Sequence, residues 1–339
     1  MSPPVVLYHY DLSPYAAKIK DALALKKIPH KRVEVSWIAP RPELSEILGI
    51  PYRRIPVLAI GNDVYCDSNM IALALERRFP ASEGYGTLFP PRRGTNKVDQ
   101  GIMKAFSVFF IDNAVFHGAT DHIPYERLTP EFIVDRSSFR GHYIDVPAIA
   151  ARREEVKSTL SSYLHLIEEQ LVDGRDWLLD TEGPSLADNA AYFVFYWMKD
   201  FMRSLDDLWD PVRFPRSMEW ISRMTTLLED LRKENAAPFE AITGQEAAKL
   251  ISSSQPEDLD IIGFDSVEAS RLNVARGEVV TVMPRDHGQV PTCGKLLALS
   301  QEEVVIETGS DTIILRCHFP RLNFSIRPKR DSDSGTAKL

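Results

Sequence analysis

Two serine residues that precede helix-like segments are the first candidates for chemistry in this sequence. Ser13 stands before Pro14, and serine is favoured as an N-cap while proline is favoured at the first helical position. Asp67 and Ser68 precede a second apolar segment that contains Ile71. Because the N–H groups at a helix N-terminus are unpaired and carry partial positive charge, each of these ends could hold an anion. The sequence therefore predicts a pocket that suits a small anionic ligand carrying a thiol.

The segments around these serines predict the elements that must position them. Residues 5–8 are apolar and rich in valine, which is typical of a buried strand, and residues 31–35 alternate as a second strand. The helix between these strands has an apolar face, and we expect Lys18, Lys20 and Asp21 to lie outside that face.

A hairpin is predicted before the second serine. Residues 55–60 and 64–66 are apolar and flank Gly61-Asn62-Asp63, which has the residue types of a turn. Pro56 donates no ladder hydrogen bond and so belongs at a strand start, an edge or a bulge. If the bond from Ile55 to Pro56 is cis, the chain reverses locally. Ile55 would then offer its own N–H and C=O to a peptide-like ligand.

These pieces together resemble the N-terminal domain of the glutathione S-transferases, which has a thioredoxin-like fold. The resemblance covers residues 4–79. Three motifs carry it, in the order of that family: Ser13-Pro14, Arg54-Ile55-Pro56-Val57-Leu58, and Asp67-Ser68 followed by Ile71. The first is similar to the Ser-Pro of the serine-type classes, the second to the element that holds a cis-proline, and the third to the acidic-Ser pair that holds the γ-glutamyl end of glutathione.

The resemblance implies glutathione, as co-substrate or catalytic cofactor, and gives each motif a part of that ligand. Asp67 would meet the α-ammonium group of glutathione. Ser68 and the helix end behind it would meet the α-carboxylate. Ile55 would pair with the cysteinyl backbone. Arg54 would bind the glycyl carboxylate, with its basic neighbour Arg53 as the alternative.

Ser13 is the implied activating group for the glutathione thiol. A free thiol has a pKa of ~8.5, which a hydroxyl donor and a helix N-terminus both lower. Tyr8 and Tyr10 are the alternatives, because the tyrosine-type classes supply the hydroxyl from the end of the first strand. All three also have ordinary structural interpretations, as an N-cap and as packed strand aromatics. Serine in place of cysteine favours conjugation or glutathione-assisted isomerisation over disulfide chemistry.

The composition is that of a multidomain globular chain. Its 339 residues suffice for two or three domains of ~100–200 residues, and 44% of them are hydrophobic. A net charge of -8 argues against a nucleic-acid partner. Cys66, Cys293 and Cys317 are too widely spaced to indicate a disulfide framework or a metal site. We expect a cytoplasmic protein without a membrane partner, since no signal peptide is evident and the longest apolar run, residues 190–198, is too short to span a bilayer.

The middle of the chain is predicted to be an all-helical domain, residues 96–245, after a linker at 84–95 that is rich in Gly, Pro and Arg. Residues 120–147 are interpreted as an insertion with short helices that could cover the pocket. Ser185 and Asp188 have the spacing of a capping box at the start of a buried helix. The resemblance implies that a hydrophobic second substrate would lie against Tyr15, Phe109, Asn113 and His117. The last three have the spacing of one helical face, and ordinary core packing is the alternative interpretation.

Strand-like segments follow the helical part. Five of them, separated by turns, lie within residues 260–328, which we interpret as a small antiparallel barrel or sandwich, and residues 329–339 are expected to be disordered. A typical glutathione transferase ends before these strands. The additional part could cover the active site, block the usual dimer face or bind a partner.

The sequence thus predicts a thioredoxin-like α/β domain at residues 1–82, an all-α domain and a small all-β domain. The leading hypothesis is a glutathione transferase or isomerase that acts on a hydrophobic, electrophilic small molecule, with a homodimer as one option for its assembly. One alternative is a non-catalytic scaffold that binds a protein through the β part. The other is a glutathione-independent enzyme that uses His117 or Tyr15 as acid or base.

Overall fold

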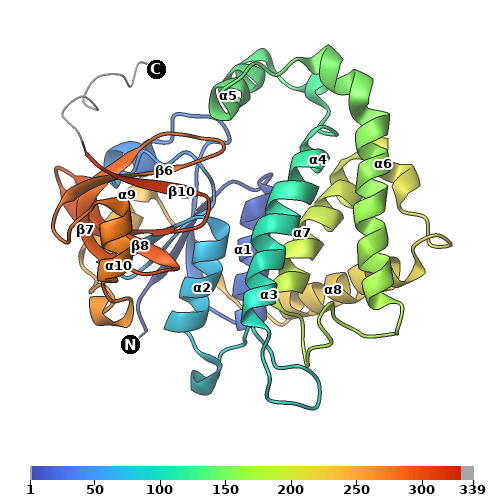
Figure 1. Ribbon diagram of the computed structural model, residues 1–339, viewed down its shortest axis with the longest axis horizontal. Coiled ribbons are helices and arrows are strands. Elements are labelled where there is room, and N and C mark those ends of the chain that lie inside the picture. Colours follow the sequence, from blue (N-terminus) through green and yellow to red (C-terminus); the bar gives the residue numbers. More distant parts are fainter. Residues whose placement is uncertain (1, 330–339) are drawn as a thin grey trace.

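A single mixed sheet of ten strands runs through the molecule, in the order β10-β6-β7-β8-β9-β4-β3-β1-β2-β5. The structure is a computed structural model that describes residues 2–329. The expected disordered tail at 329–339 therefore lies, except for its first residue, outside the described residues. Figure 1 shows the C-terminal strands on one side of helices α1 and α2 and the long helices of the middle region on the other.

The N-terminal part has the expected thioredoxin-like arrangement. β1 pairs in parallel with β2 and antiparallel with β3, and β3 forms a hairpin with β4. The turn of that hairpin is Gly61-Asn62. Gly61 has a φ of 63°, a backbone conformation that residues with a side chain rarely adopt. The elements of this part are β1 (Val5–His9), α1 (Pro14–Lys26), β2 (His30–Glu34), the π-helical turn η1 (Glu43–Ile47), β3 (Val57–Ile60), β4 (Asp63–Cys66) and α2 (Ser68–Arg78).

The helical domain also forms as predicted, and it covers α1. Its main elements are α3 (Gln100–Ala105), the π-helix η3 (Phe106–Val115), α4 (Phe116–Thr120), α5 (Pro130–Arg140), α6 (Val146–Leu171), α7 (Leu186–Phe201) and α8 (Pro215–Lys233). The capping box is present, since the Asp188 carboxylate accepts from the backbone N–H of Ser185 at 2.9 Å. It also accepts from the indole N–H of Trp220 at 3.0 Å, which ties α7 to α8.

The prediction that Lys18 and Asp21 lie outside the core was wrong. Both side chains are buried, because α7 and α8 pack against the side of α1 that a two-layer arrangement would leave in water. The Asp21 carboxylate is paired there with the guanidinium of Arg232 at 2.6 Å. Lys20 alone keeps part of its side chain in solvent and pairs with the exposed Asp11 at 2.6 Å.

The C-terminal strands do not close into a separate barrel or sandwich. They pair antiparallel in the order β10-β6-β7-β8-β9. At one edge β10 has β6 as its single neighbour, and at the other β9 also pairs in parallel with β4 of the thioredoxin-like part. This C-terminal sheet comprises β6 (Val279–Pro284), β7 (Thr292–Leu299), β8 (Glu303–Ser310), β9 (Ile313–Pro320) and β10 (Phe324–Pro328). The sequence interpretation missed the separate short strand β5 (Phe239–Ala241), which pairs in parallel with β2. Both edges of the thioredoxin-like sheet are thus covered by later parts of the same chain.

Two further helices attach the C-terminal sheet. They are α9 (Gly244–Ser252) and α10 (Ser266–Leu272). α9 packs against η1 and β9, and its buried residues Ala247 and Ile251 join a core that also holds Val6, Val64 and Cys317. The face of the sheet opposite α1 and α2 is therefore one continuous apolar layer shared by the two sheet regions.

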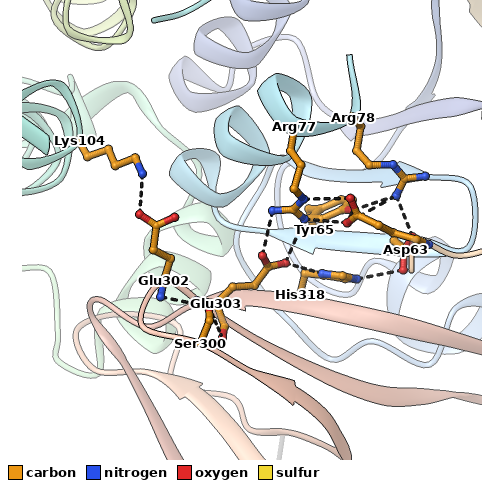
Figure 2. Close-up of polar contacts among 10 residues, drawn as sticks. Asp63, Tyr65, Arg77, Arg78, Lys104, Ser300, Glu302, Glu303 and His318 are labelled. Atoms are coloured by element: carbon orange, nitrogen blue, oxygen red, sulfur yellow. Dashed lines mark hydrogen bonds and ion pairs between the residues drawn. The ribbon is translucent and has the colours of Figure 1, made fainter. Parts of the chain in front are cut away.

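A buried cluster of charges lies at the junction of β4 and β9 (Figure 2). The His318 ring, fully buried, contacts Asp63 Oδ1 through Nε2 at 3.0 Å and Glu303 Oε1 through Nδ1 at 2.5 Å. Arg77 of α2 donates to Glu303 at 3.1 Å, and Arg78 donates to Asp63 at 2.9 Å. Each carboxylate therefore has two cationic or potentially cationic partners, which offsets the cost of removing it from water.

The protonation of this cluster follows from its contacts. Burial alone would lower the pKa of His318, but the hydrogen bonds to Asp63 and Glu303 raise it above its ordinary value. Burial alone would raise the pKa of each carboxyl group, but His318 lowers both. The contribution of the imidazolium to folding stability is thus fully present below the pKa of histidine in the unfolded chain, about 6.5. It is lost as the pH rises through the higher pKa of the folded state. The contribution of the two carboxylates to folding stability is present above about pH 4.5. It is lost as the pH falls through the lowered pKa values of Asp63 and Glu303.

We predict that His318→Gln lowers the free energy of unfolding by about 3 kcal/mol near pH 5.5, because it leaves two buried carboxylates without their shared cation. The difference from wild type should narrow as the pH rises above neutrality. Denaturant titrations at several pH values measure this. His165→Gln, which removes a largely exposed histidine from an i,i+4 pair with Glu169, is the matched control and should change stability far less. An equal loss for His318→Gln at every pH would contradict this account of the cluster.

Candidate active site

A cavity of about 900 Å³ lies where the thioredoxin-like part, the helical domain and the C-terminal sheet meet. Ten of the twelve residues predicted from the sequence line it: Tyr10, Ser13, Tyr15, Arg54, Ile55, Pro56, Asp67, Ser68, Asn113 and His117. Tyr8 and Phe109 are not among the lining residues. The three sequence motifs therefore meet at one concave surface, although more than fifty residues separate the first from the last.

Ser13 brings the N-terminus of α1 to the cavity. Its side chain accepts a hydrogen bond from the Ala16 N–H at 3.2 Å, so it is the N-cap that the sequence predicted. A hydroxyl group has one proton to donate besides its two acceptor lone pairs. Capping uses one lone pair, and the proton of Ser13 remains for a partner in the cavity.

Ile55 supplies peptide groups to the same surface. The Ile55–Pro56 bond is cis, and β3 begins only at Val57. Among the residues that the structure describes, neither the N–H nor the C=O of Ile55 has a hydrogen-bond partner. Buried peptide groups are almost always paired, so these two are suited to a ligand backbone.

Asp67 and Ser68 bring the start of α2 to the cavity. The Asp67 side chain caps the helix by accepting from the Asn69 N–H at 2.9 Å. Its φ of 85° costs a non-glycine residue about 1–3 kcal/mol, and such conformations concentrate at functional sites. Burial raises the pKa of Asp67, while the charge of Arg54 opposes that rise.

Lys18 does not line the cavity, but it supports one of the helix starts that do, a role that the sequence interpretation missed. Its ammonium group is fully buried beside the first turn of α2 and donates to Ser68 Oγ at 3.2 Å and Asn69 Oδ1 at 3.3 Å. It also forms an ion pair with Asp112 of η3 at 3.4 Å. This buried ion pair joins α1, α2 and the helical domain directly behind the start of α2. No local signal could have shown it, because the three groups are distant in sequence.

The two tyrosines proposed as alternatives to Ser13 have different environments. Tyr8 points to the opposite face of the sheet, where it is fully buried among apolar side chains and burial raises its pKa. It is therefore not placed to meet a ligand in the cavity. Tyr10 does line the cavity, and its hydroxyl oxygen accepts from Arg136 of α5 at 3.3 Å.

The wall of the cavity on the helical side differs from the predicted face. Phe109, Asn113 and His117 were expected on one α-helical face, but residues 106–115 form a π-helix. Its i→i+5 hydrogen bonds change the number of residues per turn, so α-helical spacing no longer selects one face. Phe109 is half exposed to solvent and lies outside the cavity. The apolar part of the wall comes instead from Val108, Phe116 and Trp197, and Phe116 also contacts Tyr15 at a ring distance of 4.6 Å.

The insertion at residues 120–147 reaches back to the thioredoxin-like part through α5. Figure 1 shows α5 between the C-terminal strands and α6. Arg53 donates to Asp135 at 2.9 Å and to Ser138 at 3.0 Å, and Arg136 donates to the Trp37 carbonyl at 2.6 Å. Because α5 residues also line the cavity, the insertion lies over one side of it, as a cover would.

The C-terminal sheet reaches the cavity through the loop between β6 and β7. Asp286 of this loop forms an ion pair with Arg54, and the His287 carbonyl accepts from Arg54 Nη2 at 2.7 Å. The His287 ring lies 5.5 Å from that of His117, between ring centroids. Arg54 was predicted to bind a ligand carboxylate, and in the structure its partner is a carboxylate of the chain itself.

Two absences hold for residues 2–329. No helix there combines the length and the apolar composition that a bilayer crossing requires. Nor does that range hold a group of three or more His, Cys, Asp or Glu side chains arranged to bind a metal ion.

Comparison with known proteins places the fold. Residues 7–83 match the family described as glutathione S-transferase, N-terminal domain, and residues 120–233 match a domain of unknown function (DUF7962). No curated protein matches the sequence. A GST-like protein from Pseudomonas syringae is similar in structure, with a TM-score of 0.70 and 22% identity over 97% of this chain and 100% of that chain. Since that alignment spans nearly the whole chain, it includes the C-terminal strands.

Two plant structures are similar over a shorter part. The tau class glutathione S-transferase of mango, Mangifera indica, has a TM-score of 0.50 and 15% identity over 73% of this chain and 98% of its own. Rice GST1, solved in complex with glutathione, has a TM-score of 0.50 and 16% identity over 74% of this chain and 96% of its own. The chain therefore has the glutathione S-transferase fold, followed by an additional C-terminal sheet region.

We predict that Lys18→Met lowers the free energy of unfolding by about 3 kcal/mol, because Asp112 would keep a mostly buried charge without its cation. Lys20→Met is the matched control, two residues away on the same helix with an exposed partner, and should cost much less. Denaturant titration with comparison of m-values measures both. Equal losses in the two variants would show that the buried ion pair has no special role in holding α1, α2 and η3 together.

Proposed function

We propose that this protein is a glutathione-dependent transferase or isomerase that acts on an apolar, electrophilic small molecule. The observation that carries the proposal is the meeting of two helix N-termini and the unpaired peptide groups of Ile55 at one end of a cavity with an apolar wall. A γ-glutamyl-cysteinyl peptide has groups that complement each of these features.

The ligand would lie across the end of the sheet. Its cysteinyl peptide would pair with the N–H and C=O of Ile55, in the manner of an added strand. Its γ-glutamyl end would meet Asp67 through the ammonium group, and Ser68 with the first turn of α2 through the carboxylate. The position of Asp67 as a half-buried and conformationally strained N-cap supports this assignment.

The sulfur would then lie near the N-terminus of α1. The Ser13 hydroxyl would donate a hydrogen bond to the thiolate, and the partial positive charge of the helix end would favour the ionised form of the thiol. In a conjugation the thiolate attacks the electrophilic carbon, a carbon–sulfur bond forms and the leaving group departs with its electron pair. In an isomerisation the sulfur adds and is later expelled. Tyr15, Phe116 and Trp197 would hold the apolar part of the substrate beside the sulfur.

We predict that Ser13→Ala lowers the acid dissociation constant of the thiol of bound glutathione by about 10- to 100-fold, and so lowers its thiolate fraction at neutral pH, since a hydrogen bond to a charged group contributes about 1.5–3 kcal/mol. Calorimetry measures binding, and thiolate absorbance measures ionisation. Ser185→Ala is the matched control, because it also removes a buried serine at a helix start, but one outside the cavity. It should cost stability and leave the thiolate signal unchanged.

Other results would favour the alternatives. Binding of neither glutathione nor its glycine monoethyl ester at millimolar concentration would favour a scaffold without catalysis. Turnover of a substrate in the absence of glutathione would favour an enzyme that uses His117 or Tyr15 as acid or base. Equal thiolate signals in wild type and Ser13→Ala would remove Ser13 from the mechanism.

A further inference from the structure

The C-terminal sheet places a carboxylate against Arg54, the arginine that the resemblance to glutathione S-transferases implies for the glycyl end of the ligand. Asp286 pairs with Arg54 Nη2, and the His287 carbonyl accepts from Nη2 at 2.7 Å and from Nε at 3.2 Å. Two of the three guanidinium nitrogens of Arg54 are therefore engaged by this loop. Although burial alone would raise the pKa of Asp286, Arg54 lowers it, so the carboxyl group is ionised at neutral pH.

The charge around Arg54 is already compensated. Asp67 contributes a second negative charge close to the same guanidinium, in addition to Asp286. A free carboxylate arriving at Arg54 would lie beside Asp286, and like charges that share a site repel each other strongly when partly buried.

The loop that carries Asp286 is fixed in place, which makes simple displacement costly. The Gly288 N–H donates to the Phe139 carbonyl of α5 at 2.7 Å. Gly288 has a φ of 64°, and a Cβ there would approach the Phe139 ring to 2.6 Å, so the backbone is packed closely against that helix. His287 adds a ring contact with His117 on the same side.

We propose that Asp286 is a specificity-determining residue that occupies the place of the ligand's glycyl carboxylate. The site then favours γ-glutamyl-cysteinyl thiols in which that carboxylate is masked or absent, such as C-terminal esters and amides, over free glutathione. This inference rests on the proposed function, because it assumes that a peptide thiol lies across Ile55. It gives the additional sheet a direct role in selecting the ligand.

The test compares glutathione with its glycine monoethyl ester, which differs only at the glycyl carboxylate, by calorimetry on the full chain. We expect the wild-type protein to bind the ester at least about 5-fold more tightly. Asp286→Asn should strengthen glutathione binding by about 10-fold and change ester binding less than about 2-fold. Only glutathione carries a glycyl carboxylate that the negative charge of Asp286 would repel. Asp311→Asn, in the exposed turn between β8 and β9, removes the same charge from the same sheet and should leave the ratio unchanged.

Each outcome decides the inference. Tighter binding of glutathione than of the ester by the wild-type protein would by itself overturn the inference. So would a ratio of ester affinity to glutathione affinity that Asp286→Asn does not change. In both cases the proposed function would stand, since peptide thiols bind. Binding of neither ligand by the wild-type protein and by Asp286→Asn would remove the proposed function and this inference together.

Discussion

The pairing of β9 with β4 is the interaction on which the rest of the structure depends. It joins the four-stranded thioredoxin-like sheet, which β5 extends at its other edge, to the five-stranded C-terminal sheet, and it brings His318 between two buried carboxylates. An exposed edge strand is open to unwanted pairing, and here the chain itself occupies both edges. The same pairing fixes where the loop between β6 and β7 can reach, and so places Asp286 at Arg54.

The cavity follows from this assembly and from the charges that surround it. Helix ends supply positive potential near Ser13 and Ser68, while the buried ion pair of Lys18 and Asp112 holds the second helix start against the helical domain. α5 and the β6–β7 loop meet each other above the cavity through Gly288 and Phe139. The part of the cavity near α2 is therefore built by the thioredoxin-like part, whereas the rest is completed by segments outside it.

The sequence predicted those features whose cause is local. Ser13 and Ser185 are caps because capping depends on a few neighbouring residues, and the hairpin turn follows from glycine and asparagine. Ser68 was expected to precede the second helix, but it is the first residue of α2 and its neighbour Asp67 is the N-cap. Lys18 was misplaced because the pattern of one helix cannot show that a second layer covers its polar side. Phe109 was misplaced because π-helical winding leaves no simple sequence signal. The β4–β9 pairing joins residues some 250 apart, which no periodicity could reveal.

The location of the sulfur atom of glutathione in crystals soaked with it tests the central claim most directly. We predict a peptide paired with the backbone of Ile55 and a sulfur within about 3.5 Å of Ser13 Oγ. Its γ-glutamyl end should lie at Asp67 and Ser68. A sulfur that lies instead near the Tyr10 hydroxyl, or a peptide bound away from Ile55, would contradict the account.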